Sequence, residues 1–164
     1  MQTGGTLPPR SVLDAAPDFK GIGPLRFGMT AEMMREKWGN PLYGGPDPGD
    51  QDTQACYYLR PRKDDYALLL MIEDGKFVRA DVRKDSIIAP GGGRIGMTGD
   101  AMRKLYAGRI EAAPNKYDPS AQTLRVRPRH DEPARLVFEV DARGKVTSWR
   151  IGLPPQVDYV EGCS

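Results

Sequence analysis

The sequence predicts an α+β fold of two tandem helix-plus-antiparallel-sheet repeats, with the helices packed on one face of the sheet. Three observations support this prediction. A five-residue motif occurs twice, several segments alternate between apolar and polar residues, and turn-forming residues are abundant, with 19 Gly and 15 Pro among 164 residues. That composition is typical of short elements joined by many turns.

The duplicated motif sets the expected domain boundaries. Residues 26–30 read Arg-Phe-Gly-Met-Thr, and residues 94–98 read Arg-Ile-Gly-Met-Thr. The same offset aligns Trp38 with Tyr106 and Leu42 with Ile110, and self-similarity at a fixed spacing indicates a repeat architecture. We therefore expect a flexible tail over residues 1–19, a first repeat over 20–88 and a second repeat over 89–164, which opens with a glycine-rich linker.

Each motif leads into a short amphipathic helix. Thr30 and Thr98 are suitable N-caps, because a threonine hydroxyl accepts a hydrogen bond from an early backbone N–H of a helix. Apolar side chains then follow at i, i+4 spacing, as in the pair Met34 and Trp38, and form one buried stripe. Glycines 39 and 108 are placed to end the two helices.

Strands are expected after each helix, at residues 56–60, 66–73 and 76–83 and again at 123–127, 135–141 and 145–151. Asp74-Gly75 joins two of them and is a strong hairpin signal. Alternation assigns Val78, Ala80 and Val82 to the side under the helices, together with Leu124, Leu136, Phe138, Trp149 and Ile151. The opposite side collects arginines and is expected to face solvent.

Composition excludes several classes of function. The net charge of +2 argues against a nucleic-acid-binding protein, which usually carries a marked basic excess. No apolar run approaches the roughly 20 residues of a transmembrane helix. The first residues lack the basic and apolar regions of an export signal, which leaves either a cytosolic protein or an exported protein whose signal has been removed.

The two cysteines favour export. Cys56 and Cys163 are the only ones and do not have metal-ligand spacing. A disulfide between them would secure the C-terminus, whereas the alternative is a pair of unrelated reduced thiols. We expect the disulfide, and with it a periplasmic or secreted location.

The motif, helix, glycine and strand order resembles the repeat unit of β-lactamase inhibitor proteins and of the related small outer-membrane lipoproteins of the barrel-assembly machinery. The resemblance covers roughly residues 20–160. It implies a non-catalytic protein that binds its target with a concave sheet face. Glu161-Gly162-Cys163 lies outside the family pattern, and no target is carried over.

Candidate catalytic and ligand-binding groups have simpler structural interpretations. The single His130 lies in a proline-bounded turn, and Gly91-Gly92-Gly93 lacks the ending of a phosphate-binding loop. Asp47, Asp50 and Asp52 do not have EF-hand spacing, and the clustered methionines fit core packing. We expect no enzyme activity, no cofactor and no metal.

The arginine-rich sheet face is the candidate partner-binding site. Its ordinary interpretation is a solvated strand surface, but arginine is enriched at interface hot spots and pairs bidentately with carboxylates. The expected partner is an acidic protein loop or an anionic envelope component, and the chain itself is expected to be a monomer. The predicted function is an inhibitor or immunity-type partner of an envelope or secreted enzyme; the alternative is an envelope assembly protein. The candidate residues are Tyr58, Phe77, Arg79, Arg125, Arg127 and Arg150.

Overall fold

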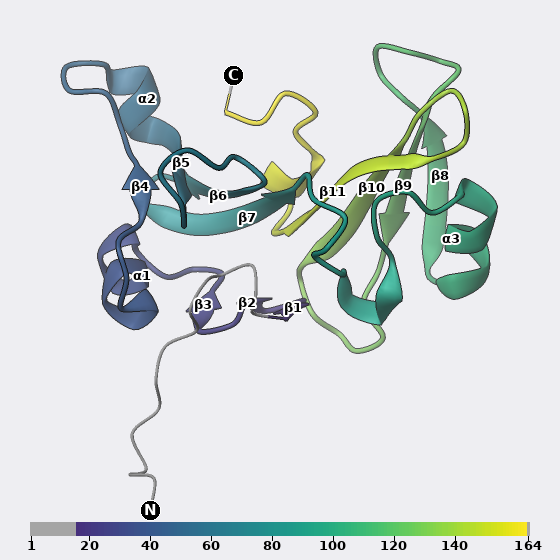
Figure 1. Cartoon of the computed structure of the whole chain (residues 1–164), viewed down its shortest axis with the longest axis horizontal. Coiled ribbons are helices and arrows are strands. Elements are labelled where there is room, and N and C mark those ends of the chain that lie inside the picture. The colour runs from purple at the N-terminus through teal and green to yellow at the C-terminus, as the bar shows by residue number, and fades with distance from the viewer. Residues whose placement is uncertain (1–15, 164) are drawn as a thin grey trace, which may run out of the picture.

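The computed structural model describes residues 16–163 and has an α+β fold built on one large antiparallel sheet (Figure 1). The expected tail lies largely in residues 1–15, outside the described part. The sheet has eight strands in the order β4-β5-β6-β7-β11-β10-β9-β8. Their bounds are Tyr43–Gly44 (β4), Cys56–Arg60 (β5), Leu68–Glu73 (β6), Lys76–Val82 (β7), Ile110–Pro114 (β8), Gln122–Val126 (β9), Arg135–Val140 (β10) and Val146–Gly152 (β11).

Each half of the sheet has a helix followed by a four-stranded meander, although a short helix, Gln51–Ala55, interrupts the first meander only. Helix α1 (Ala31–Trp38) precedes the meander β4–β7, and helix α3 (Gly99–Leu105) precedes the meander β8–β11. The halves meet where β7 pairs antiparallel with β11, with Val82 opposite Trp149. The result is one continuous sheet. Each predicted strand is present, whereas β4 and β8, which carry little alternation, were not predicted.

The N-caps form as expected. The Thr30 hydroxyl accepts a hydrogen bond from the Met33 N–H, and the Thr98 hydroxyl accepts one from Ala101, both at 3.1 Å. Helix α1 ends at Gly39, whose φ of 76° is left-handed, a conformation that glycine adopts without strain.

The main core lies between the sheet and these two helices. Met34 and Trp38 of α1, with Met102 of α3 and the following Tyr106, are buried against one sheet face. Trp149, Phe138 and Ile151 are buried on that face too. This confirms the side predicted to lie under the helices, except at Val78, which is buried but is not part of this core.

Phe77 departs from the predicted alternation. It was grouped with Arg79 on the open face, but it is fully buried in the main core and its ring lies 4.9 Å from that of Phe27. The β6–β7 pairing shifts register between Met71 and Ile72, opposite Val78. A bulge adds one residue to a strand and reverses the facing of the residues beyond it.

The N-terminal region is also more ordered than predicted. Pro17–Asp18 (β1), Gly21–Ile22 (β2) and Leu25–Arg26 (β3) form a second, three-stranded sheet. Residues 17–18 were assigned to the flexible tail, yet β1 pairs with β2. Ile22 and Leu25 then join the main core.

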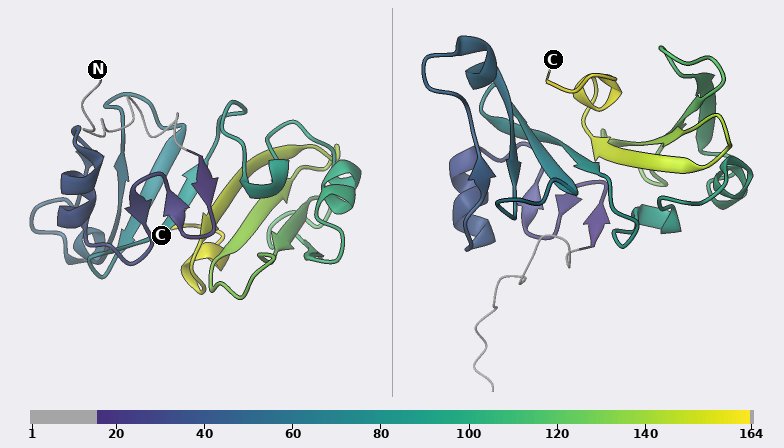
Figure 2. Two further views of the ribbon diagram at one scale, coloured as in Figure 1. Left: turned by 90° about the horizontal axis from the view of Figure 1, so that it is seen from below. Right: turned by 45° about the horizontal axis from the view of Figure 1, so that its top comes forward.

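The helices do not all share one face. The short α2 (Gln51–Ala55) was not predicted, and it lies on the same side of the sheet as the C-terminus, away from α1 (Figures 1 and 2). Within residues 16–163, none of the helices is both long and apolar enough to span a membrane.

Candidate functional site

The second face of the sheet is covered in part by the end of the chain. We call residues 153–163 the C-terminal strap; it includes the 3₁₀ turn η3 (Gln156–Asp158). Figure 2 shows the strap between the two arms of the bent sheet, on the side opposite the three-stranded sheet. The face predicted to be solvated is therefore partly buried, because the strap returns across it.

Arg79 binds the strap through backbone carbonyls. Its Nη1 donates to the carbonyl oxygens of Gln156 and Tyr159, each at 2.7 Å. Its Nε and Nη2 form a bidentate pair with the Asp81 carboxylate at 2.9 and 2.6 Å. Arg79 is only 3% exposed, and a charge buried to that degree is stable only when paired and hydrogen-bonded.

Arg150 makes the equivalent contacts one strand away. Its Nε donates to the Val157 carbonyl at 2.6 Å, and its Nη1 pairs with the Glu139 carboxylate at 2.8 Å. Glu139 also accepts hydrogen bonds from Asn115 and Thr123. Val157 is fully buried, so the strap is fixed by an apolar anchor as well as by polar contacts.

Arg125 is the most exposed member of this group. It forms a bidentate ion pair with Asp158 at 2.9 and 3.1 Å, and both side chains keep more than a third of their exposure. Exposed pairs of this kind contribute little to stability, about 0.2–1 kcal/mol. Arg125 therefore positions the outer side of the strap more than it stabilises the fold.

The predicted disulfide is present. Cys56 and Cys163 are bonded, with their Cα atoms 5.4 Å apart and a sequence separation of 107. Because Cys56 begins β5 in the first half of the sheet, the bond joins the end of the chain to the arm opposite β8 and β9. Both cysteines of the chain are used in it.

Tyr58 lies beneath the last residues of the strap. Its phenol oxygen accepts a hydrogen bond from the Cys163 N–H at 3.3 Å, and a Cβ added to Gly162 would collide with the same oxygen. Burial raises the pKa of Tyr58 above its ordinary value, and the negative charge of Asp81 raises it further.

Two hollows flank the strap. The larger has a volume of about 800 Å³ and is lined by strap residues together with Cys56, Glu73 and Lys116. The smaller has a volume of about 220 Å³, and Tyr58, Arg79 and Arg150 contribute to its lining. Val160, Glu161 and Gly162 line both, so this part of the strap is the wall that separates them.

Four of the six predicted partner-binding residues are gathered at the strap: Tyr58, Arg79, Arg125 and Arg150. Phe77 is in the main core, and the exposed Arg127 donates to the Gly108 carbonyl, away from the strap. The strap that contacts these arginines was not predicted. Its signals in the sequence were an apolar residue, Val157, shortly after two prolines, and a cysteine beside the C-terminus.

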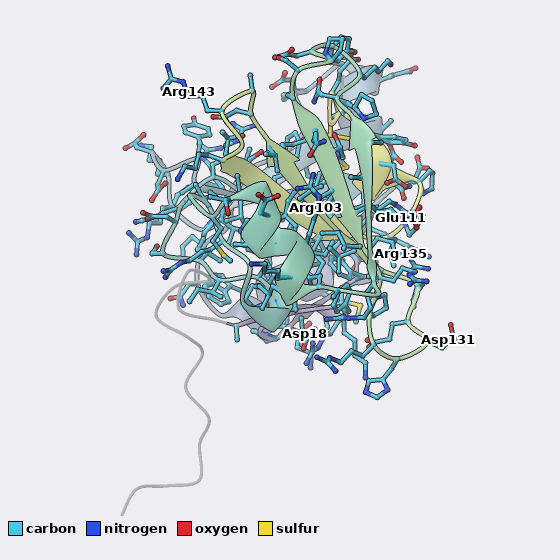
Figure 3. The ribbon with its side chains drawn as sticks, turned by 90° about the vertical axis from the view of Figure 1, so that its right-hand side faces the viewer. Asp18, Arg103, Glu111, Asp131, Arg135 and Arg143 are labelled. Carbon is cyan, nitrogen blue, oxygen red and sulfur yellow. A yellow bond between two sulfur atoms is a disulfide. The ribbon has the colours of Figure 1, made fainter. Side chains whose placement is uncertain are left out.

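Two further features of the described residues concern metal binding and the single histidine. Within the described residues no three His, Cys, Asp or Glu side chains lie close enough to hold a metal ion. His130 is exposed in the loop 127–134. The next residue, Asp131, lies at the tip of this loop in Figure 3. The face beneath the strap instead presents guanidinium, phenol and carboxylate groups, which suit recognition of a polar surface.

Comparison with known proteins identifies solved structures of similar fold but does not assign the chain to a family. No family model matches the chain, and no curated protein matches it. The solved structure of the uncharacterized protein yfeY from Escherichia coli is similar, with a TM-score of 0.52 and 16% identity over 84% of this chain and 99% of that one. An extracellular protein containing a SCP domain from Bacillus anthracis is also similar, with a TM-score of 0.50 and 11% identity over 94% of this chain. This chain spans 50% of the length of that protein.

Proposed function

We propose that the chain is an exported, non-catalytic protein-binding module, and that its partner inserts a segment into the larger hollow beside the strap. The observation that carries the proposal is this hollow of about 800 Å³, which is lined by residues of α2, β5 and β6, by Lys116 in the loop after β8, and by the strap. A disulfide in one wall keeps the site preformed, and preformed sites lose less conformational entropy on binding. An inhibitor or immunity-type partner of an envelope enzyme fits this design.

Export is supported by two findings. The described residues contain a disulfide, a bond that forms mainly in oxidising compartments, and one protein of similar fold is described as extracellular. Alkylation of the denatured protein, isolated from its native compartment, tests the first: both thiols should resist alkylation until they are reduced.

The lining of the hollow changes the expected chemistry of the partner. Arg79, Arg125 and Arg150 already pair with carboxylates of the chain itself. The hollow is lined instead by Glu73, Glu161 and Lys116, and by Asp158, whose carboxylate is the one that pairs with Arg125. Even without Asp158, carboxylates outnumber ammonium groups in this lining. A partner segment that carries lysine or arginine therefore suits it better than the acidic loop predicted from the sequence.

We also infer that the two halves are copies of one unit, as the repeated motif suggested. In support, a β-bridge joins the N-cap Thr30 to Lys76, and another joins Thr98 to Lys145. Both lysines follow a glycine in the last hairpin of their half. Duplication would place the hollow close to the junction of two equivalent units.

The test is affinity capture from secreted and periplasmic proteins of the source organism, followed by titration calorimetry with the captured partner. Val160→Lys adds a positive charge to a wall of the acidic hollow, where it would repel the lysine or arginine of the partner, and we expect it to raise the Kd at least tenfold. Leu105→Lys, the same kind of change at a comparably exposed apolar residue of α3, should leave the Kd within twofold. An unchanged Kd for Val160→Lys would place the partner elsewhere, and the absence of any partner would refute the proposed function.

A further inference from the structure

Two consecutive parts of the strap, residues 156–159 and residues 160–163, are held by different kinds of contact. Residues 156–159 are fixed by the carbonyl contacts of Arg79 and Arg150 and by the buried Val157. Residues 160–163 are tied to the sheet through the Cys56–Cys163 bond and the hydrogen bond from Cys163 to Tyr58. Breaking the disulfide therefore removes the covalent restraint on the second part and leaves the contacts of the first part in place.

The second part of the strap is also the wall between the two hollows. Val160, Glu161 and Gly162 contribute to both linings. If these residues move away, the larger hollow extends over the sheet to Tyr58 and Arg83, which now line only the smaller one. The joined groove would gain a phenol and an exposed guanidinium on its floor.

The disulfide lies where a reductant can reach it. Both of its cysteines line the larger hollow, and both are partly exposed. Reaction with a thiolate requires access to a sulfur atom, and the hollow provides that access. A disulfide enclosed in the main core would not have this property.

We propose that the strap is a redox-controlled gate, in which a dithiol reductant opens the Cys56–Cys163 bond and releases residues 160–163. A thiolate of the reductant attacks one sulfur, and the other cysteine leaves as a thiolate and takes up a proton. The second thiol of the reductant, as a thiolate, then attacks the reductant's own sulfur in the mixed disulfide, and the remaining cysteine leaves as a thiolate and takes up a proton. Two electrons pass to the protein, which gains two thiols, and the reductant ends as a disulfide. The regulatory meaning of the gate rests on the proposed binding function, whereas the opening itself does not.

The test is amide hydrogen exchange on the full chain before and after treatment with dithiothreitol, with intact mass confirming complete reduction. We expect the Cys163 amide to exchange at least tenfold faster after reduction. The amides of Val157, Asp158 and Tyr159 donate hydrogen bonds to carbonyls of residues 153–156. Their exchange rates should change less than twofold. The double variant Cys56→Ser/Cys163→Ser should behave like the reduced protein without any reductant.

A second readout follows the phenol beneath the gate. Opening exposes Tyr58 to water, so its pKa should fall toward the ordinary tyrosine value, as measured by ultraviolet titration with Tyr58→Phe assigning the signal. Unchanged Cys163 exchange and unchanged Tyr58 titration after full reduction would overturn the gate. Faster exchange throughout β7, β10 and β11 would overturn it as well, because the disulfide would then maintain the fold. Neither readout involves a partner, so failure here leaves the proposed binding function to its own test.

Discussion

The two faces of the large sheet are stabilised in different ways. The face toward α1 and α3 is a continuous apolar layer of aromatic and aliphatic side chains. The face beneath the strap buries two arginines, each paired with a carboxylate and with carbonyl oxygens. Apolar burial is non-directional and sums over area, whereas buried ion pairs contribute little net stability and impose a specific geometry. The first face holds the fold together, and the second fixes the position of one segment.

The largest expected effect is in the apolar layer. Phe138 is fully buried, and its ring lies 5.7 Å from Tyr106 and 6.3 Å from Trp149. Phe138→Ala would leave a cavity between these rings and should lower the free energy of unfolding by about 3–5 kcal/mol. Urea denaturation followed by circular dichroism measures the loss. If Phe138→Ala lowered the free energy of unfolding less than a substitution at an exposed residue such as Tyr117→Ala, the assignment of this face as the main core would be contradicted.

The strap face should respond more strongly to removal of one charge than to removal of both. Arg79→Met leaves the largely buried Asp81 carboxylate without its partner, and such a break costs about 3 kcal/mol or more. Adding Asp81→Leu removes the orphaned charge, so the double variant should recover the part of the loss that comes from the ion pair, whereas the contacts of Arg79 with the strap carbonyls stay lost. Equal stability of the single and double variants in the same urea assay would show that the pair is not coupled.

Alkaline pH should perturb both faces. Tyr106 lies on the helix side and donates to the Pro90 carbonyl, and burial raises its pKa as it does for Tyr58 under the strap. A pKa raised in the folded state contributes stability below the ordinary value near 10, and this contribution is lost as pH rises through the folded value. The free energy of unfolding should therefore fall above pH 10, and less so in Tyr58→Phe and Tyr106→Phe. A flat profile between pH 9 and about 11 would contradict this.

The two faces also differed in how well the sequence predicted them. The helix side follows from alternation and N-caps, so Ala80, Val82 and Ile151 were assigned correctly. Phe77 was not, because a bulge is a property of strand pairing and leaves little trace in a single strand. For the other face, the arginines were identified as a group, but the segment that they bind, the C-terminal strap, was not.

The physical reason is the type of contact. Arg79 and Arg150 bind carbonyl oxygens of the strap, and every residue carries such an oxygen, so no side-chain pattern marks the site. Only the cysteine pair connected the two regions in sequence, and from it the disulfide was predicted correctly. Contacts made by the backbone over long sequence separations need the fold itself to be known.

The smallest expected effect on stability comes from the Arg125–Asp158 pair, which positions the strap without contributing much to the free energy of unfolding. Arg125 and Asp158 form a well-aligned but exposed pair, so Arg125→Ala should cost less than about 1 kcal/mol of unfolding free energy. The same change removes a tether on η3 and should still increase amide exchange of residues 157–159. Added salt should reproduce part of that increase in the wild type, because exposed pairs are screened, and it should have little effect on Arg79, which is buried. If Arg125→Ala destabilised the protein as much as Arg79→Met does, the strap would be integral to the core rather than a segment positioned against it.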